Sequence, residues 1–568
     1  MTGQKEPSAP TLLDRLEPQA LTLFPDDPQR RERLLRGIAE LVETYRPRLK
    51  GRHRARMDQA TTYVITYADS VVRSGQAPLV TLREVLNHTV GQAVSDVHLL
   101  PMFPWTSDDG FGVVDHRQLN PRLGTWDDVA GLGQDYQLMF DFVANHVSSS
   151  SPWFVGWLAG DPRYADFFIS PGPDFDVSRV VRPRTSPLTH SYPRPDGNQV
   201  AAWTTFGPDQ VDINAANPEV ILELTDVLLG YLARGATTVR LDAIGYLWKA
   251  SATTSIHLPG THSIIKLWRA IVDDIAPGAR ILTETNVPHQ DNITYFGDGF
   301  DEAHMVYQFV LPPLVLHTFV AGDASALSSW VAHLDPPPGG TTWFNFLASH
   351  DGIGMRAVEP VLPEVDRQRL VQRALAVGGA VSYATTADGG QGVYELNVSY
   401  LDALAGAVDD PWAVARRALA AHALLFSLAG VPAVYVHSLV GSSHDEKGMA
   451  ASGINRRINR QQLQADALLA EIAHSPRRAD IVQGLRTLLR VRAAHQQFGP
   501  WAPQEVVDLG AQTFAVRRGE PGDTILAVVN VSGRPIDVPG PIGTDVLTGE
   551  RVEGLRLDTD HYRWIKED

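Results

Sequence analysis

The sequence predicts an α/β protein whose main part is a (β/α)8 barrel. Three observations lead to this fold class: a chain of 568 residues, eight short apolar or β-branched runs that alternate with helical patterns, and polar clusters at the ends of several runs. Strands that alternate with helices form parallel βαβ units, and eight such units favour a closed barrel over an open sheet. The pattern also indicates a helical N-terminal extension, an inserted subdomain after the third strand and a C-terminal antiparallel β domain.

Residues 1–58 form the predicted helical N-terminal extension. In the stretch RRERLLRGIAELVETYR, apolar side chains recur at Leu34, Ile38, Leu41 and Val42, which is the spacing of one helix face. An apolar helix face has to be covered, so we expect the extension to pack against the barrel.

The barrel is predicted over residues 59–495. Its eight strands are expected in the runs TTYVITY (61–67), DVHLLPM (96–102), YQLMFDFV (136–143), TTVRLDA (237–243), ARILTET (279–285), AHMVYQF (303–309), TTWFNFLASHD (341–351) and VPAVYV (431–436). A closed barrel of this kind carries its chemistry at the carboxyl ends of the strands.

Two further segments differ from the strand and helix alternation. Residues 147–205 are rich in Pro, Ser, Asp and Arg, which predicts an inserted subdomain of irregular structure that overhangs the active face. Residues 496–568 contain short alternating runs such as TFAVRRG and TILAVVNVSG, which predict a small antiparallel β domain.

Composition limits the partners. The net charge of −16 disfavours binding to nucleic acid or to anionic membranes. The absence of cysteine excludes disulfides, thiolate metal sites and a cysteine nucleophile. The chain has no apolar run of about 18 residues, and its start lacks the basic and apolar segments of a signal peptide. We therefore expect a cytoplasmic monomer or homodimer that acts on small molecules.

Four polar clusters lie at strand ends: DFVANH (141–146), RLDA (240–243), TETN (283–286) and SHD (349–351). Cleavage of a glycosidic bond with retention needs one carboxylate that attacks the anomeric carbon and a carboxylic acid about 5 Å away that protonates the leaving oxygen. Asp242 and Glu284 end neighbouring strands, and Arg240 lies on the same side of its strand as Asp242 and can keep that carboxylate ionised. A buried carboxylate that satisfies backbone groups explains any single cluster, but not four in this order.

These clusters resemble the four signature regions of the α-amylase family, glycoside hydrolase family 13. The resemblance covers the chain from about Thr61 onward. It implies that Asp242 is the nucleophile, Glu284 the general acid/base, and Asp351 a third carboxylate that holds sugar hydroxyls. It also implies that His146 and His350 bind the donor glucose, although each alone would be read as a satisfied core histidine.

Within this family, several stretches resemble the sucrose phosphorylase group: DDGFGVVDH (108–116), WTTFGPDQVDIN (203–214), RLDAIGY (240–246), LPPLVLH (311–317), SHDGIG (349–354) and RRINR (456–460). The resemblance implies that Asp108 and Arg456 close around the far hydroxyls of one glucose. It further implies apolar platforms at Phe111 and Phe206, for which core packing is the alternative. Gln210 would supply a polar contact and Tyr246 would line the cleft.

The N-terminal extension and the stretches RPRTSPLTHSY (182–192), TTSIHLPGTH (253–262) and TETNVPHQDNITYFG (283–297) are more similar to the glucosylglycerate phosphorylases of this group. This implies reversible phosphorolysis of 2-O-α-glucosylglycerate, with inorganic phosphate as co-substrate and without a cofactor or metal. Arg182 and Arg184, two residues apart, are candidates for an anion site if their segment is extended. Solvated loop arginines are the alternative, and the anion site would then lie among Lys249, His257 and His262.

Other functions stay open at this point. The same catalytic pair can pass the glucosyl group to water or to another hydroxyl, as a glucosidase or transglucosidase does. Sucrose and glucosylglycerol are the nearest other phosphorylase substrates. A non-catalytic binding barrel is disfavoured because Asp242, Glu284, Asp351 and Arg240 are all present.

Overall fold

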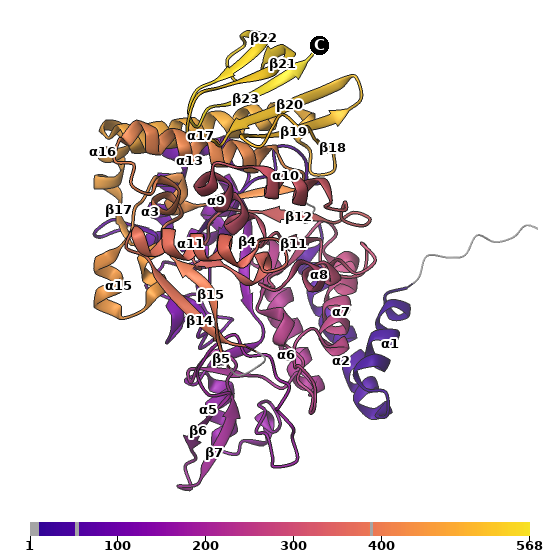
Figure 1. Ribbon diagram of the computed structural model, residues 1–568. Coiled ribbons are helices and arrows are strands. Elements are labelled where there is room, and N and C mark those ends of the chain that lie inside the picture. The colour runs from indigo at the N-terminus through magenta and orange to yellow at the C-terminus, as the bar shows by residue number, and fades with distance from the viewer. Residues whose placement is uncertain (1–10, 52–55, 387–389) are drawn as a thin grey trace, which may run out of the picture.

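In the computed structural model, which describes residues 11–51, 56–386 and 390–568, eight parallel strands close into a barrel (Figure 1). In chain order the strands are β1 (Tyr63–Thr66), β3 (Asp96–Leu99), β4 (Gln137–Val143), β9 (Ala236–Asp242), β10 (Arg280–Thr283), β11 (Met305–Tyr307), β12 (Thr342–Asn345) and β16 (Val431–Tyr435). Seven of the eight lie within the predicted runs and β9 begins one residue before its run, so the predicted fold class is confirmed.

Helices cover the outside of the barrel. The larger ones are α3 (Pro78–Thr89), α4 (Trp126–Asp135), α6 (Pro218–Ala233), α7 (Pro259–Ile275), α9 (Leu311–Ala321), α11 (Glu364–Ala376), α13 (Pro411–Ser427) and α17 (Pro476–Ala494). Several begin with proline, whose fixed φ and missing N–H suit the first helical turn. Asn217 and Asp410 cap α6 and α13 by accepting backbone N–H groups. The shorter helices include α10 (Ser325–Ala332), α12 (Tyr400–Ala405), α14 (Val436–Leu439), α15 (Glu446–Ser452) and α16 (Ala465–His474).

The connection after the fifth strand departs from the predicted pattern of a strand followed by a helix. It contains only the short helix α8 (His289–Asn292) and a 3-10 turn before β11. Gly297 and Gly299 adopt φ values of 57° and 93°, which end helical structure in this segment.

The N-terminal extension forms two helices, α1 (Leu12–Leu23) and α2 (Pro28–Leu49). The break falls where Asp27 caps α2 and Pro28 begins it. The helices pack on α7 and α6 at one side of the barrel (Figure 1). Arg33 pairs with Glu219 of α6 at 2.5 Å, so a polar contact accompanies the apolar packing.

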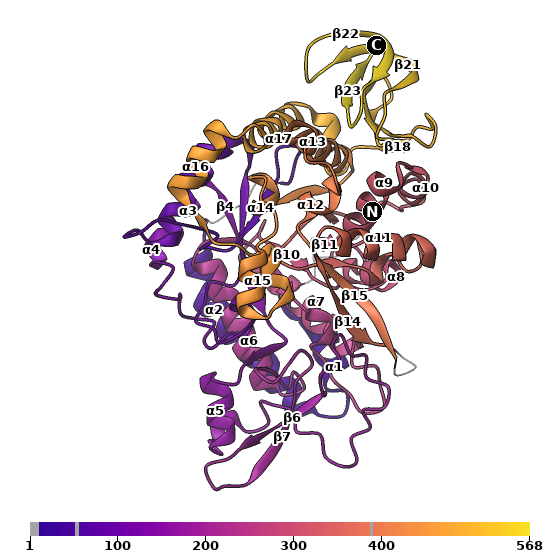
Figure 2. The same cartoon turned by 60° about the vertical axis from the view of Figure 1, so that its left-hand side comes forward.

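The predicted insert, residues 147–205, lies between β4 and α6 and is more regular than expected. It contains α5 (Pro152–Leu158) and the hairpin of β6 (Thr189–Pro193) and β7 (Gln199–Trp203), and β5 (His146–Ser148) and β8 (Gln210–Asp212) lie at its two ends. Strands β5 and β8 pair with each other and lead back to the barrel. Figures 1 and 2 show the β6–β7 hairpin at the far end of the molecule from the C-terminal sheet.

A second excursion, which the sequence pattern did not reveal, separates the seventh and eighth strands. It carries a three-stranded sheet of β13 (Ile353–Gly354), β15 (Gln391–Asn397) and β14 (Ala380–Thr385). The Thr385 hydroxyl donates to the carbonyl oxygen of Arg184 at 3.3 Å, so this sheet touches the insert. The two excursions therefore meet beside the barrel.

The C-terminal strands form a six-stranded antiparallel sheet in the order β18 (Gln504–Val506), β19 (Thr513–Glu520), β20 (Asp523–Asn530), β23 (Tyr562–Glu567), β21 (Ile536–Asp545) and β22 (Arg551–Leu557). It lies against α13 and α10, at the end of the molecule shown at the top of Figure 1. Buried Arg518 donates to the carbonyl oxygen of Ser427 at 2.7 Å and ties the sheet to the end of α13.

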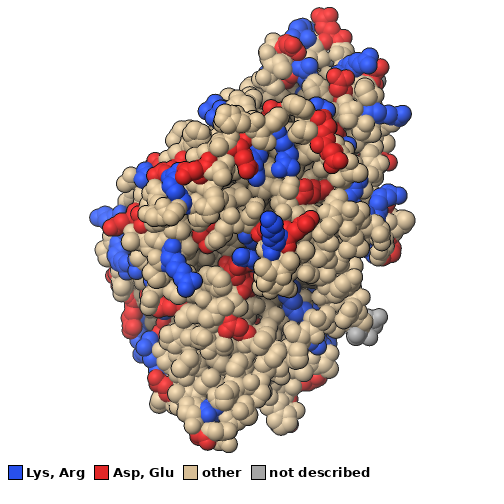
Figure 3. All heavy atoms as spheres, turned by 90° about the vertical axis from the view of Figure 1, so that its left-hand side faces the viewer, with Lys and Arg blue, Asp and Glu red and all other residues tan. Residues whose placement is uncertain are grey.

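The charge distribution on the surface and the character of the helices relate to the predictions about nucleic acid and membranes. On the face shown in Figure 3, acidic and basic side chains are interspersed. Among the helices in the described ranges, none combines the length and the apolar character that crossing a membrane requires.

Two short strands, β2 (Val71–Val72) and β17 (Leu463–Gln464), pair outside the barrel.

Candidate active site

A cavity with about 1020 Å³ of empty volume opens at the carboxyl ends of the barrel strands. The ends of β9 and β10, the segment after β12 and both excursions contribute to its wall. Of the residues predicted from the sequence, it is lined by Asp108, Phe111, His146, Arg184, Phe206, Gln210, Asp242, Tyr246, Glu284, His350, Asp351 and Arg456.

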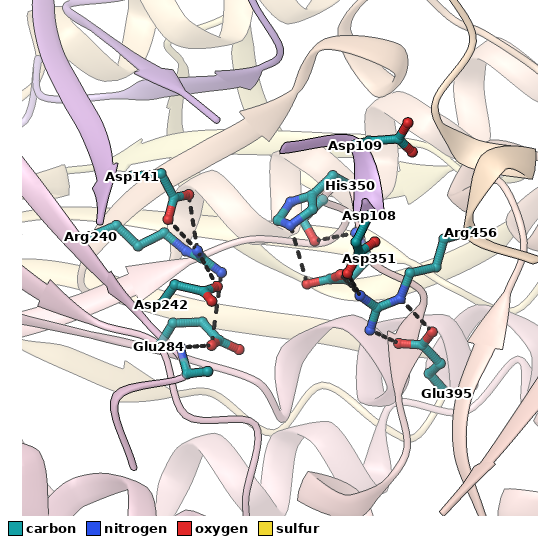
Figure 4. A network of polar contacts seen from close by, with 12 residues as sticks. Asp108, Asp109, Asp141, Arg240, Asp242, Glu284, His350, Asp351, Glu395 and Arg456 are labelled. Atoms are coloured by element: carbon teal, nitrogen blue, oxygen red, sulfur yellow. Dashed lines mark hydrogen bonds and ion pairs between the residues drawn. The ribbon is translucent and has the colours of Figure 1, made fainter. Parts of the chain in front are cut away.

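The guanidinium of Arg240, buried beneath the cavity, holds the predicted catalytic pair (Figure 4). Its Nη1 donates to Asp242 Oδ1 at 2.7 Å, and its Nη2 lies 3.9 Å from Glu284 Oε2. Arg240 and Asp242 point to the same side of β9 because side chains alternate along a strand. Asp141 on β4, in register with Arg240, accepts a further bond at 2.8 Å. Arg240 is thus fixed from below and orients Asp242 toward the cavity.

Arg240 acts more directly on the carboxyl group of Asp242 than on that of Glu284. Burial raises the pKa of both Asp242 and Glu284, and Arg240 opposes that rise. Repulsion between two ionised carboxylates favours a state in which the pair keeps one proton. Arg240 bonds to Asp242 at 2.7 Å but lies 3.9 Å from Glu284, so it favours ionised Asp242 and leaves the proton to Glu284. An ionised nucleophile and a protonated acid are the states that a double displacement requires.

The backbone also orients Glu284. The N–H of Ala243 donates to Glu284 Oε2 at 2.9 Å, which leaves Oε1 to carry the proton into the cavity. Ala243 has φ 46° and ψ 30°, a left-handed conformation that is costly for a residue with a Cβ. The strained backbone at the end of β9 therefore places the Ala243 N–H where it holds the Glu284 carboxyl group.

The third predicted carboxylate, Asp351, lies in a cluster of charges at one end of the cavity (Figure 4). Arg456 Nη1 lies 2.7 Å from Asp351 Oδ1 and 3.8 Å from Asp108 Oδ2. Burial acts to raise the pKa of Asp351, but the charges of Arg456 and Arg460 outweigh it and hold the pKa below its ordinary value. Asp351 is therefore an ionised acceptor for the hydroxyl groups of a sugar.

Asp108 and Asp109 both adopt left-handed backbone conformations, with φ values of 50° and 49°. Arg460 Nη1 lies 3.1 Å from Asp108 and 2.9 Å from Asp109, and Arg457 pairs with Asp109 at 2.7 Å. These ion pairs offset the backbone strain and fix the Asp108 carboxylate in the cavity wall. Arg460 is closer to Asp108 than Arg456, the partner that the sequence resemblance implied.

The predicted aromatic and histidine side chains form a neutral part of the wall. Phe111 stacks on His350 with ring centroids 4.8 Å apart and an interplanar angle of 5°. Gln210 Nε2 lies 3.2 Å from His146 Nε2, and Phe206 meets Tyr246 edge-on at 5.5 Å. Burial lowers the pKa of His146 to about 4 and that of His350 well below its ordinary value. Both rings are thus neutral near pH 7 and can exchange hydrogen bonds with sugar hydroxyls.

The two arginines predicted as an anion pair do not share a face, because their segment is bent rather than extended. Arg182 donates to the backbone carbonyl oxygen of Ser186 in its own loop. Arg184 lies over the rings of Phe206 and Tyr394, 5.6 and 5.1 Å from their centroids. Arg184 alone of the two lines the cavity, and Arg182 holds the loop together.

The three residues named as another anion site are engaged with protein partners. Each contact joins one of them to another side chain: Lys249 Nζ to Asp212 at 2.8 Å, His257 Nδ1 to Tyr295 at 2.7 Å, and His262 Nδ1 to Glu302 at 2.8 Å. Burial lowers the pKa of His257 to about 4, so its ring is neutral and cannot act as the cation of an anion site.

Sequence reasoning missed two cavity residues on β15, Tyr394 and Glu395. Glu395 accepts two bonds from Arg456, at 2.8 and 2.9 Å, and thereby fixes the guanidinium that contacts Asp351 (Figure 4). The stretch that carries them has the alternation of a strand, but no local signal marks it as part of the site. Its role comes from contact with a residue 61 positions away.

In the described part of the chain, no group of three or more His, Asp or Glu side chains is arranged to hold a metal ion. Asp108, Asp242 and Asp351 instead each lie within ion-pair distance of arginine.

Comparison with known proteins agrees with this arrangement. A family model described as alpha amylase, catalytic domain, matches residues 84–333. The chain is 45% identical over 505 residues to a glucosylglycerate phosphorylase of Allomeiothermus silvanus, covering 88% of this chain and 90% of that protein. It is 40% identical over 538 residues to a glucosylglycerate phosphorylase of Escherichia coli, covering 94% and 96%.

A solved structure shows the same fold. The crystal structure of sucrose 6F-phosphate phosphorylase from Thermoanaerobacter thermosaccharolyticum matches with a TM-score of 0.74 at 23% identity, over 90% of this chain and 100% of that chain. The sequence clusters, the barrel fold and the similarity to these proteins all indicate the same family. The chain belongs to the α-amylase family, glycoside hydrolase family 13, in the group that contains the glucosylglycerate and sucrose phosphorylases.

Proposed function

We propose that this chain is a retaining phosphorylase that converts 2-O-α-glucosylglycerate and inorganic phosphate reversibly into α-glucose 1-phosphate and glycerate. One observation carries the proposal: the cavity that holds the Asp242 and Glu284 pair also contains Arg184, a guanidinium that forms no ion pair with the described residues. The 45% identity to the Allomeiothermus silvanus phosphorylase over 505 residues supports the choice of acceptor.

In the first half of the reaction, the Asp242 carboxylate attacks the anomeric carbon of the glucosyl group. The bond from that carbon to the glycerate oxygen breaks, and Glu284 gives its proton to the departing oxygen. Asp351, Asp108 and Arg456 hold the sugar hydroxyls during this step. The product is a glucosyl ester of Asp242 with inverted configuration.

In the second half, phosphate enters on the side that glycerate has left. Glu284, now a carboxylate, takes a proton from phosphate while a phosphate oxygen attacks the anomeric carbon and releases Asp242. Two inversions restore the α configuration. Arg184 favours phosphate over water because a guanidinium forms paired, charge-assisted bonds with phosphate oxygens.

Phosphorolysis of a panel of glucosides tests the proposal. With 2-O-α-glucosylglycerate we expect phosphate-dependent release of glucose 1-phosphate, and slower release from sucrose and 2-O-α-glucosylglycerol. Proton NMR of the fresh product should show the α anomer. A β-phosphate product would exclude Asp242 as nucleophile, and release of free glucose at a rate independent of phosphate would identify a hydrolase.

A second test compares two arginines of the insert. Replacing Arg184 with Ala should raise the phosphate concentration for half-saturation by roughly 10- to 100-fold, because a lost charge-assisted bond costs about 1.5–3 kcal/mol. Arg179→Ala removes an exposed arginine outside the cavity lining, and this control should change the value less than about twofold. Kinetics with phosphate varied at fixed glucoside measure both. Equal effects of the two variants would show that Arg184 has no direct role toward phosphate.

A further inference from the structure

Arg356 is an arginine beside the cavity that neither the sequence motifs nor the reaction scheme above employs. It follows β13, whose Gly354 pairs with Glu395 and lines the cavity. The N–H of Met355 donates to the carbonyl oxygen of Tyr394 at 2.9 Å, which continues the pairing up to Arg356. The sheet thus holds the backbone up to Met355, and Arg356 begins the 3-10 turn that follows.

The strand also passes close to the end of β10. A Cβ built on Gly354 would lie 2.5 Å from Asn286 Nδ2, so a larger residue there would displace the Asn286 side chain. Asn286 lines the cavity, and its Oδ1 is buried without a hydrogen-bond partner among the described residues. A buried amide oxygen without a partner is costly unless a ligand satisfies it. Asn286 therefore offers an acceptor to a ligand hydroxyl at this place.

The guanidinium of Arg356 is half-buried, and its side chain has no hydrogen bond or ion pair with the described part of the chain. Its charge acts on the hydroxyl of Tyr246, which lines the cavity. Burial raises the pKa of Tyr246, and Arg356 and Arg184 both oppose that rise. Two cations without an ion-pair partner thus flank one tyrosine in the cavity wall.

The approach of β13 to Asn286 gives the end of the cavity that Arg356 follows. Gly354, two residues before Arg356, packs against Asn286, which follows the acid Glu284 by two residues, and all three of Gly354, Asn286 and Glu284 line the cavity. Glu284 protonates the departing oxygen, so this end of the cavity is where a leaving group or acceptor has to lie.

We propose that Arg356, with Asn286 beside it, binds the carboxylate and hydroxyl groups of an acidic acceptor and makes the enzyme select anionic over neutral acceptors. The inference rests on the proposed phosphorylase function. In this arrangement Arg184 attracts phosphate, whereas Arg356 holds the carboxylate of a small hydroxy acid. The guanidinium matches a carboxylate with two parallel bonds, which a neutral polyol cannot form.

The experiment measures glucosyl transfer from α-glucose 1-phosphate to two acceptors of the same carbon skeleton, glycerate and glycerol. In Arg356→Ala we expect kcat/KM for glycerate to fall roughly 10- to 100-fold, with the value for glycerol changed less than about twofold. The retained reaction with glycerol shows that the variant folds. Arg356→Lys keeps the charge without the planar guanidinium, so its kcat/KM for glycerate should lie between those of the parent and of Arg356→Ala.

Two controls separate the outcomes. Arg179→Ala removes an exposed positive charge of the insert that does not line the cavity and should leave the acceptor ratio unchanged. Lactate and propane-1,2-diol form a second matched pair, so the charge test does not depend on glycerate. A parent enzyme that does not use glycerate would refute the proposed function. A parent that prefers both acids, with an Arg356→Ala variant of unchanged acid-to-neutral ratio, would overturn the role of Arg356 alone.

Discussion

Replacing Asp242 with alanine is expected to reduce turnover of every glucoside by about 10⁴-fold or more, because no other group can form the covalent intermediate. The fold should persist. Arg240 keeps its bonds to Asp141, at 2.8 and 2.9 Å, when Asp242 is removed. Steady-state rates and circular dichroism measured on the same preparation check both statements.

Asp226→Asn is the matched control for this variant. It removes a carboxylate of α6 that pairs with Arg117 at 2.7 Å outside the cavity. We expect its activity to stay within about twofold of the parent. Near-normal activity in Asp242→Ala, or an equal loss in the control, would contradict the assignment of the nucleophile.

Glu284→Gln is expected to slow cleavage of glucosylglycerate by roughly 10²- to 10⁴-fold, because the amide cannot protonate the leaving oxygen. Fluoride leaves without protonation, so α-glucosyl fluoride should still glucosylate Asp242 in this variant. In the parent, the first step with glucosylglycerate should slow as the pH rises through the pKa of Glu284, which burial raises. Loss of the reaction with both donors alike would show that Glu284 is not the acid.

The repeating part of the fold could be predicted from the sequence alone. Barrel strands such as β4 are buried along nearly their whole length, so they appear as apolar runs whatever surrounds them. Asp242 and Glu284 could be found because each ends such a run. The contact of Arg240 with Asp242 follows from the two-residue spacing on one strand.

Features that depend on contacts between residues far apart in the sequence could not be predicted. Glu395 reaches Arg456 from the second excursion, whose alternating pattern does not reveal its place beside the barrel. The different directions of Arg182 and Arg184 follow from a bend around Pro183, which strand spacing cannot anticipate. Arg356 has no motif of its own, and its relation to Tyr246 appears only once β13 is paired with β15.

The proposed acceptor specificity depends on these long-range contacts more than on the catalytic pair. Asp242, Glu284 and Arg240 supply chemistry that serves any α-glucoside. Arg184 and Arg356 lie beside them on the insert and on the second excursion, respectively. Changes in these two segments can therefore alter the acceptor while the glucosyl site stays the same.

Identification of the covalent intermediate would separate double displacement from every other route. Glu284→Gln would be incubated with α-glucosyl fluoride without phosphate, digested, and analysed by peptide mass spectrometry. The mechanism predicts one added glucosyl group on the peptide that contains Asp242, and its loss when phosphate is added together with an external carboxylate base such as formate, which takes the place of Glu284. An adduct on another residue, or none while fluoride is released, would contradict a double displacement through Asp242.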